Sequence, residues 1–351
     1  MNPTSDDIRL TQFSHGAGCG CKIAPRVLDE ILSGVGAQAA DARLLVGNGS
    51  RDDAGAWDLG DGRVLLSTTD FFMPIVDDPR EFGAIAATNA LSDIYAMGGR
   101  PCMALAVLGW PIDKIPAAVA GQVVAGARAV CDEAGAMLAG GHSIDSPEPI
   151  FGLAVNGLVE REHLKRNDQA QPGDLLYLTK ALGVGILTTA EKRGTLRAED
   201  RGLAAASMLQ LNRIGAEVAA IDGVHAITDV TGFGLGGHLR EMSDGSGVQA
   251  SVELSALRLL SDLASYIRQG CVPGGTQRNF DSYGDRLGEI PAGWLEIVCD
   301  PQTSGGLLMS VAPNAAAEVE ATLRQYGLEE FSNPIGKMGE SVPGGPAVIF
   351  V

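Results

Sequence analysis

The sequence predicts a two-domain α/β protein, and three observations support that prediction. At ~150 residues per domain, the chain of 351 residues is long enough for about two domains. Strand-like apolar runs alternate with helical patterns along the whole chain. The polar stretch 160–174 contains Pro172 and Gly173 and has little to bury, so we place the boundary there, with an N-terminal domain over 1–158 and a C-terminal domain over 170–351.

Each predicted strand is a short aliphatic run, and each predicted helix has apolar residues every three or four positions. In the first half this predicts, in order, a strand at Val64–Thr68, a helix at Glu81–Met97, a strand at Cys102–Leu108 and a helix at Ala117–Ala134. In the second half it predicts strands at Leu175–Leu178, Val224–Thr228 and Val248–Glu253, with helices at Leu203–Ala220 and Ala315–Tyr326.

Composition excludes several classes of function. Asp and Glu number 43 against 26 Lys and Arg, a net charge of −17 that repels nucleic acid and anionic membranes, so neither is an expected partner. The N-terminus carries charges and no apolar segment, and no run reaches ~18 apolar residues, so we expect a cytoplasmic protein. Six cysteines are too few for a disulfide scaffold, which predicts reduced thiols.

Acidic residues form the most informative pattern. Asp70 and Asp229 each end a strand-like run, and Asp52 and Asp53 lie in a polar turn. Carboxylates at strand ends point into the crevice where α/β proteins bind ligands. Oxygen ligands without nearby His or Cys favour a hard cation such as Mg²⁺, which usually bridges to phosphates. The alternative is that each Asp is a helix N-cap or a turn residue.

Asp93 is unusual because helical spacing places it, with Asn89, on an otherwise apolar stripe. A buried carboxylate there costs several kcal/mol unless it is paired or bound to metal. The segments 90–98 and 226–234 share a weak pattern that aligns Asp93 with Asp229. If this echo is a true duplication, each half presents an acid in a similar setting.

Glycine motifs narrow the kind of nucleotide site. No Walker sequence occurs, which excludes an ordinary P-loop ATPase. In Leu138–Ser143 an aliphatic run leads into the glycine pair 140–141, and we expect a turn that offers amide donors and the His142 imidazole at a sheet edge.

A rival interpretation comes from Gly232-x-Gly234-x-x-Gly237, a formal match to the dinucleotide-binding fingerprint. Asp229 crowds that turn with a negative charge where a pyrophosphate would lie.

The segment His15–Lys22 contains two thiols, three glycines and a lysine. A thiol beside a cation in a flexible loop is typical of a reactive cysteine, and we expect Lys22 to favour the Cys19 thiolate. An adventitious surface thiol and half of a zinc site are the alternatives; Cys19-x-Cys21 lacks a second ligand pair for zinc.

Eight segments of the chain form a recognisable series, namely His15–Pro25, Arg51–Asp53, Ser67–Pro74, Ala86–Gly99, Leu138–Ile144, Thr228–Leu235, Pro273–Phe280 and Asp300–Leu308. In these segments, in their order and nearly end to end, the chain closely resembles the selenophosphate synthetases. The resemblance implies the two-domain α/β (α+β) fold of the group that includes aminoimidazole ribonucleotide synthetase. It also implies a homodimer whose N-terminal domain sheets join across the interface.

This resemblance implies that the chain converts ATP, selenide and water to selenophosphate, AMP and phosphate, for selenocysteine and selenouridine production. ATP is then a substrate, several Mg²⁺ ions accompany it, and a selenium-delivery protein is a possible partner. The residues that match the family's motifs are the catalytic Cys19 and Lys22 on a mobile loop over about 11–25, the nucleotide contacts Lys22, Ser50, Arg51, Asp52, Asp70, Asp93, Gly141, His142 and Ser143, and the metal ligands Asp53, Asp93 and Asp229.

Three hypotheses therefore remain open at the level of sequence. The first is this synthetase, the second is a nicotinamide oxidoreductase that uses Gly232–Gly237, and the third is a non-catalytic relative that only binds nucleotide. A relative released from catalysis would be free to lose Cys19 or Lys22, and both are present.

Overall fold

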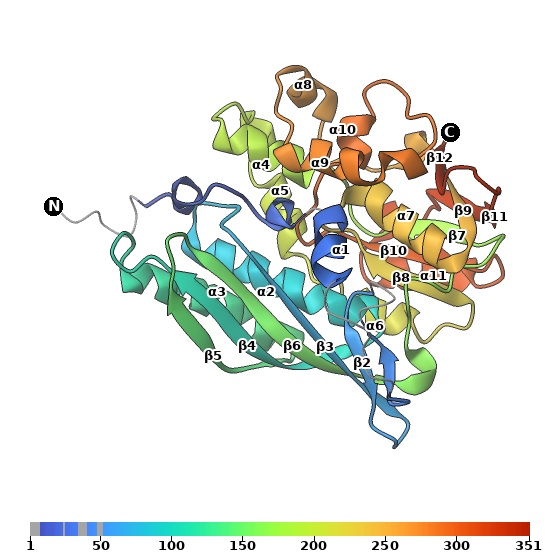
Figure 1. The fold of residues 1–351 in the computed structure, drawn as a ribbon, viewed down its shortest axis with the longest axis horizontal. Coiled ribbons are helices and arrows are strands. Elements are labelled where there is room, and N and C mark those ends of the chain that lie inside the picture. Colours follow the sequence, from blue (N-terminus) through green and yellow to red (C-terminus); the bar gives the residue numbers. More distant parts are fainter. Residues whose placement is uncertain (1–7, 24, 34–40, 48–51) are drawn as a thin grey trace.

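The computed structural model describes residues 8–23, 25–33, 41–47 and 52–351, and these form two six-stranded sheets with helices packed between and around them (Figure 1). The first sheet lies in the N-terminal half and the second in the C-terminal half, as the mixed α/β prediction requires. Within the described ranges, no helix combines the length and apolar character needed to cross a membrane.

The N-terminal sheet has the order β1-β2-β3-β6-β4-β5, and all neighbours are antiparallel except the parallel pair β4 and β5. Helices α2 and α3 cover one of its faces (Figure 1). The elements of this half are β1 (Leu44–Val46), β2 (Gly55–Asp58), β3 (Arg63–Phe72), β4 (Arg100–Trp110), β5 (Met137–Asp145), β6 (Ile150–Glu160), α1 (Pro25–Ser33), α2 (Pro79–Ala96) and α3 (Ala117–Ala134).

The C-terminal sheet has the order β12-β9-β11-β7-β10-β8 and contains one parallel pair, β12 and β9. Its strands are β7 (Leu175–Leu178), β8 (Val224–Asp229), β9 (Val248–Val252), β10 (Leu307–Val311), β11 (Gly336–Glu340) and β12 (Val348–Phe350). Its helices are α4 (Val184–Lys192), α5 (Leu203–Leu209), α6 (Ile214–Val218), α7 (Gly234–Ser246), α8 (Leu263–Arg268), α9 (Gly274–Tyr283), α10 (Leu295–Val298) and α11 (Ala316–Gln325).

One predicted helix, Leu203–Ala220, is wrong, because the chain forms two helices, α5 and α6, with a break between them. Gln210 at the break is extended, and its carbonyl accepts a hydrogen bond from Lys180 Nζ at 2.6 Å. The Asn212 side chain donates to Ser92 Oγ in α2 at 2.8 Å. Tertiary hydrogen bonds at the break therefore override a helical pattern that is continuous in the sequence.

Helix α2 lies between the two domains and is buried on nearly all sides (Figure 1). It begins with Asp78 as N-cap, whose side chain accepts the Glu81 N–H at 2.7 Å, and Pro79 occupies the first turn. From Phe82 to Ala96 every residue except Ala84 is buried. It packs on β3, β6 and α3 of its own half and on α5, α6 and β8 of the other half.

Two glycines allow α2 and α3 to approach closely. A Cβ atom added at Gly83 would overlap the carbonyl oxygen of Val123, and one added at Gly126 would overlap that of Arg80. The backbones therefore touch where any side chain would force them apart.

We expect Gly126→Ala to destabilise the protein by about 2–3 kcal/mol, because the added methyl group overpacks this contact. Gly121→Ala in the same helix is the matched control, because nothing lies within 4 Å of its added Cβ. This control should be neutral or stabilising by about 0.5–1 kcal/mol. Chemical denaturation of both variants measures the difference, and equal stabilities would contradict the close approach.

Candidate active site

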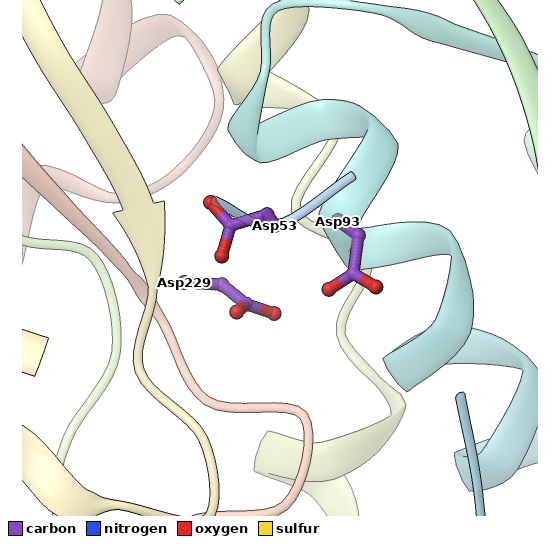
Figure 2. A group of neighbouring side chains, drawn as sticks. All are labelled: Asp53, Asp93 and Asp229. Atoms are coloured by element: carbon purple, nitrogen blue, oxygen red, sulfur yellow. The ribbon is translucent and has the colours of Figure 1, made fainter. Parts of the chain in front are cut away.

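Three aspartates from different elements meet where the two domains touch (Figure 2). Asp53 lies in the loop before β2, Asp93 in the last turn of α2, and Asp229 at the end of β8. One carboxylate oxygen of each lies within 4.8 Å of the others. The structure thus brings together the three residues that the sequence singled out as metal ligands, from positions up to 176 residues apart.

Asp93 and Asp229 are buried and Asp53 is half-buried, and few hydrogen bonds compensate their carboxylates. Thr228 Oγ1 donates to Asp53 Oδ1 at 2.9 Å, and Thr68 Oγ1 donates to Asp93. One buried oxygen of Asp53 and one of Asp229 have no hydrogen-bond partner within the described residues. Burial and the neighbouring carboxylates raise the pKa of Asp53 and of Asp93 well above the usual range, and burial raises the pKa of Asp229 to about 6. Orphaned carboxylate oxygens in such a cluster fit a hard divalent cation such as Mg²⁺.

The similar segments 90–98 and 226–234 do not form the same kind of secondary structure. Asp93 lies on a helix, whereas Asp229 ends a strand, so the expectation that each half presents its acid in the same way is wrong. The two residues nevertheless converge on one site.

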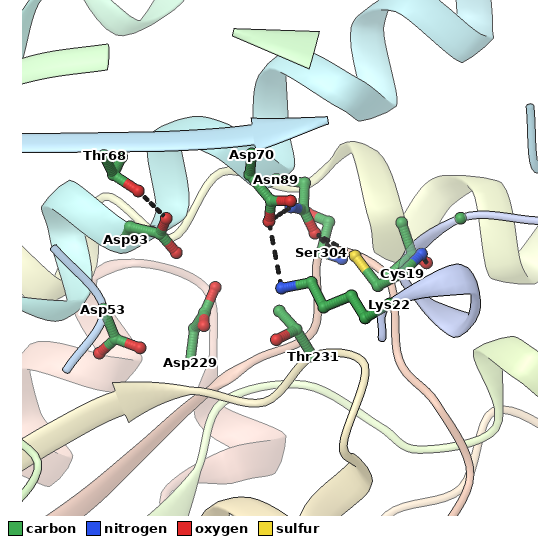
Figure 3. Close-up of polar contacts among 12 residues, drawn as sticks. Cys19, Lys22, Asp53, Thr68, Asp70, Asn89, Asp93, Asp229, Thr231 and Ser304 are labelled. Atoms are coloured by element: carbon green, nitrogen blue, oxygen red, sulfur yellow. Dashed lines mark hydrogen bonds and ion pairs between the residues drawn. The ribbon is translucent and has the colours of Figure 1, made fainter. Parts of the chain in front are cut away.

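A second group of polar residues lies beside the cluster (Figure 3). Asp70 lies inside β3, two residues before the end of the strand, rather than at its end as predicted. Its Oδ2 atom is 3.5 Å from Lys22 Nζ and also accepts a hydrogen bond from Asn89 Nδ2. Although burial alone would lower the pKa of Lys22, the negative charges headed by Asp70 raise it, so Lys22 is firmly cationic.

Cys19 is buried against this group. Its Sγ atom donates to Asn89 Oδ1 at 3.2 Å, and its backbone N–H donates to Thr303 Oγ1 at 2.9 Å. Burial and the Asp70 carboxylate raise the pKa of the Cys19 thiol well above its usual value, and Lys22 offsets only part of that rise. Lys22 thus favours the Cys19 thiolate, as expected, but burial and the Asp70 carboxylate outweigh its effect.

The chain bends at the glycines, as the approach of Lys22 to this site requires. Gly18 has φ +49°, a value that favours glycine, and Cys19–Cys21 form a short 3-10 turn. The turn separates the two thiols, since Cys21 Sγ donates to the Gly18 carbonyl at 2.8 Å rather than pointing at Asn89.

The dinucleotide-binding interpretation of Gly232–Gly237 is wrong. The strand before it, β8, pairs antiparallel with β10, whereas the fingerprint belongs to a parallel βαβ unit. A Cβ added at Gly232 would lie 2.6 Å from the Cys19 carbonyl oxygen, and one at Gly237 would lie 2.7 Å from Phe233 Cβ. These glycines admit the cysteine loop and close packing instead of a pyrophosphate.

Of the other predicted nucleotide contacts, the structure describes Asp52 but not Ser50 or Arg51. Asp52 is fully buried beside the cluster, and its Oδ1 accepts the backbone N–H groups of Asp53 and Asn167 at 3.2 and 3.3 Å. Ser50 and Arg51 fall outside the described residues. These nucleotide roles remain predictions.

Gly141, His142 and Ser143 do not form the predicted turn, because they lie within the edge strand β5. Glycine is needed at 141 because an added Cβ would overlap the Ala106 carbonyl oxygen of β4. Register through β4 and β6 aligns Gly141 with Asp70, three strand spacings or about 14 Å away. His142 aligns with Phe71, and hence lies on the opposite sheet face from Asp70. Within one chain, these residues are not brought to the aspartates.

Sequence reasoning missed the role of Asn89 and of the segment before β10. Asn89 joins Asp70, Cys19 and the backbone N–H of Ser304, which it accepts at 2.7 Å. Ser304 is the non-glycine residue with positive φ in the described part of the chain, at +50°. The available signal was the place of Asn89 one turn before Asp93 on the buried stripe.

Comparison with known proteins agrees with this architecture. Residues 51–159 match the AIR synthase related protein N-terminal domain, and residues 171–346 match the C-terminal domain of the same family. Selenide, water dikinase of Yersinia pseudotuberculosis is 60% identical over 334 residues, 95% of each chain. That of Pseudomonas aeruginosa is 61% identical over 336 residues, 96% of this chain and 97% of its own.

The chain belongs to the selenide, water dikinase family. Solved structures share its fold at lower identity. A thiamine-monophosphate kinase from Stenotrophomonas maltophilia has a TM-score of 0.63 at 20% identity and covers 94% of this chain and 96% of its own. The hydrogenase maturation protein HypE in complex with ATP has a TM-score of 0.61 at 20% identity, covering 98% and 94%. In this family setting, the aspartate cluster and the adjacent cysteine loop form the candidate active site.

We expect Asp93→Asn to raise the metal-free stability by about 1–3 kcal/mol near pH 7, because it removes a buried carboxyl group whose charged form is opposed by burial and by the neighbouring carboxylates. The sign follows from the raised pKa values of the cluster: the native state binds more protons than the unfolded chain, so stability falls as pH rises through about 6, the pKa of Asp229. The gain from Asp93→Asn should therefore grow over that window, as thermal melts at pH 5 and pH 7 would measure.

The same substitution should weaken Mg²⁺ binding, as should Asp53→Asn and Asp229→Asn, and the affinity of the unmodified protein should fall below pH 6 because protons compete for the carboxylates. Calorimetric titration with Mg²⁺ measures this. A large loss of stability in Asp93→Asn, with Mg²⁺ binding unchanged, would contradict the assignment of the cluster.

The two thiols should behave differently. We expect Cys19→Ser to abolish the selenide-dependent reaction and Cys21→Ser to leave it intact. Of the two thiols, only that of Cys19 reaches the group formed by Asn89 and Asp70. Lys22→Ala should match Cys19→Ser, since it removes the cation beside Asp70. Steady-state assays measure this, with nucleotide binding as the control that both cysteine variants should pass. Equal inactivation by both cysteine changes, with loss of bound metal, would point to a two-thiol metal site.

Proposed function

We propose that the chain makes selenophosphate from selenide, ATP and water, with release of AMP and phosphate. The observation that supports this most strongly is the meeting of two different chemistries at one place. A buried triad of carboxylates suited to a phosphate-bound cation lies next to a thiol and a lysine. The name of the related enzymes, selenide, water dikinase, states the reaction, and we assign its steps to these residues.

In this proposal Asp53, Asp93 and Asp229 hold Mg²⁺ ions, which neutralise phosphate charge and stabilise the transferring phosphoryl group. Lys22 donates to phosphate oxygens and neutralises negative charge near Asp70. Asn89 fixes the positions of Asp70 and Cys19 through its two hydrogen bonds. Cys19 receives or guides selenide, and its loop moves to expose the buried thiol.

We also propose a homodimer. The sheet face opposite α2 and α3 exposes a set of large apolar residues, namely Phe71, Met103, Leu105, Met137 and Ile144, with exposed fractions from 39% to 70%. Such a face is typical of an association surface. Pairing of two N-terminal sheets would cover it and would allow Gly141, His142 and Ser143 to serve a nucleotide site shared with a second copy.

The cellular setting belongs to the same proposal. Selenide and the free thiols of the described cysteines require a reducing compartment, which the cytoplasm provides. A selenium-delivery protein as donor would limit the escape of a readily oxidised substrate.

The test is phosphorus NMR of the protein with ATP, Mg²⁺ and selenide under anaerobic reduction. We expect a new phosphorus resonance coupled to selenium, together with AMP and phosphate in equal amounts. Omission of selenide is the control and should leave no such resonance. ADP as the final nucleotide, or consumption of NAD(P)H without use of ATP, would overturn the proposal.

A further inference from the structure

A small cavity borders the cysteine loop where the loop meets α9. Its walls include Cys19, Lys22, Gly232, Arg278 and Asn279. Its volume is about 10 Å³, room for one water-sized molecule. The cavity therefore suits a ligand with a single heavy atom and excludes a nucleotide.

The walls carry positive charge in a strongly acidic protein. Two lining residues, Lys22 and Arg278, are cations and none is an acid, although the chain has a net charge of −17. Lys22 is paired with Asp70, whereas the Arg278 guanidinium donates to the Gly20 carbonyl at 2.7 Å and forms no ion pair with a carboxylate of the described residues. Cations at the mouth of a small cavity concentrate anions there.

The cavity also lies between the protein surface and Cys19, the residue that carries the thiol. Arg278 is exposed, whereas Cys19 is 1% exposed, and both line the same space. On its other side Cys19 contacts Asn89, beyond which lie Asp70 and the aspartate cluster. An anion that approached from that side would be repelled by the carboxylates and by bound phosphates. Approach past Arg278 is therefore the electrostatically favoured route.

We propose that this cavity is the binding site through which hydroselenide reaches Cys19, with Arg278 supplying the charge that attracts it. This inference rests on the proposed function. Hydrogen selenide is a stronger acid than a thiol and is a monoanion at neutral pH, with a single heavy atom. The exposed Arg278 side chain is flexible enough to admit an ion larger than water. Arg278 binds the substrate before reaction and takes no part in bond making.

Three variants distinguish attraction of the anion by Arg278 from a purely structural role, in which Arg278 only holds the loop through its hydrogen bond to the Gly20 carbonyl. Arg278→Gln removes the charge but keeps a donor for the Gly20 carbonyl, whereas Arg278→Lys keeps the charge. Arg268→Gln, at the exposed end of α8 and away from the cavity, is the matched control.

We expect Arg278→Gln to raise the KM for selenide about 10-fold or more, with the KM for ATP and kcat unchanged. Arg278→Lys and Arg268→Gln should stay close to the unmodified protein. The dependence of kcat/KM for selenide on salt should also weaken in Arg278→Gln. The proposal would be overturned if Arg278→Gln kept full activity while Arg278→Lys lost it, or if kcat fell without change in the KM for selenide. Either result would mean that Arg278 only holds the loop in place through the Gly20 carbonyl.

A second measurement does not depend on turnover. Bromide has nearly the size and charge of hydroselenide and is located in crystals by its anomalous scattering. We expect a bromide peak beside Arg278 in the cavity of the unmodified protein and its loss in Arg278→Gln. No peak in the unmodified protein, or an equal peak in both, would overturn the site. Absence of selenophosphate in the NMR experiment, with the bromide peak present, would instead disprove the proposed function and leave an anion site.

Discussion

Electrostatic repulsion among three buried carboxylates is the constraint on which the site depends. Asp53, Asp93 and Asp229 are held within 4.8 Å although burial and mutual charge raise their pKa values. A fold bears such a cost when a ligand repays it, and a divalent cation with its phosphates is the ligand that these oxygens match.

Helix α2 makes that arrangement possible. It is buried between the halves, so the side chains of one helix face both domains. Asn89 and Asp93, one turn apart, project from it toward the cysteine loop and toward the cluster. The close contact of α2 with α3 through Gly83 and Gly126 anchors the helix to its own sheet. A rigid helix thus sets the separation between the aspartate cluster and the thiol.

The cysteine loop completes the site from a distance in sequence. Thr303 holds the Cys19 amide, Arg278 holds the Gly20 carbonyl, and Met73 pairs with Gly18. All of these contacts are single hydrogen bonds to the backbone, which cost little to release. These contacts suit the loop movement that the proposed function requires, and in the observed position burial and Asp70 raise the pKa of the Cys19 thiol.

The sequence by itself determined the local features. Aliphatic runs and helical spacing gave α3 and β7 at their observed bounds, and the misplaced carboxylate on an apolar stripe marked Asp93, because periodicity and the cost of burying charge are local properties. Tertiary structure decided the rest. It broke Leu203–Ala220 into two helices, carried Gly141–Ser143 into an edge strand, and buried Cys19 beside Asp70, which raises the pKa of its thiol. Each of these outcomes depends on partners between 30 and 120 residues away in the chain, and a pattern within one segment contains no information about them.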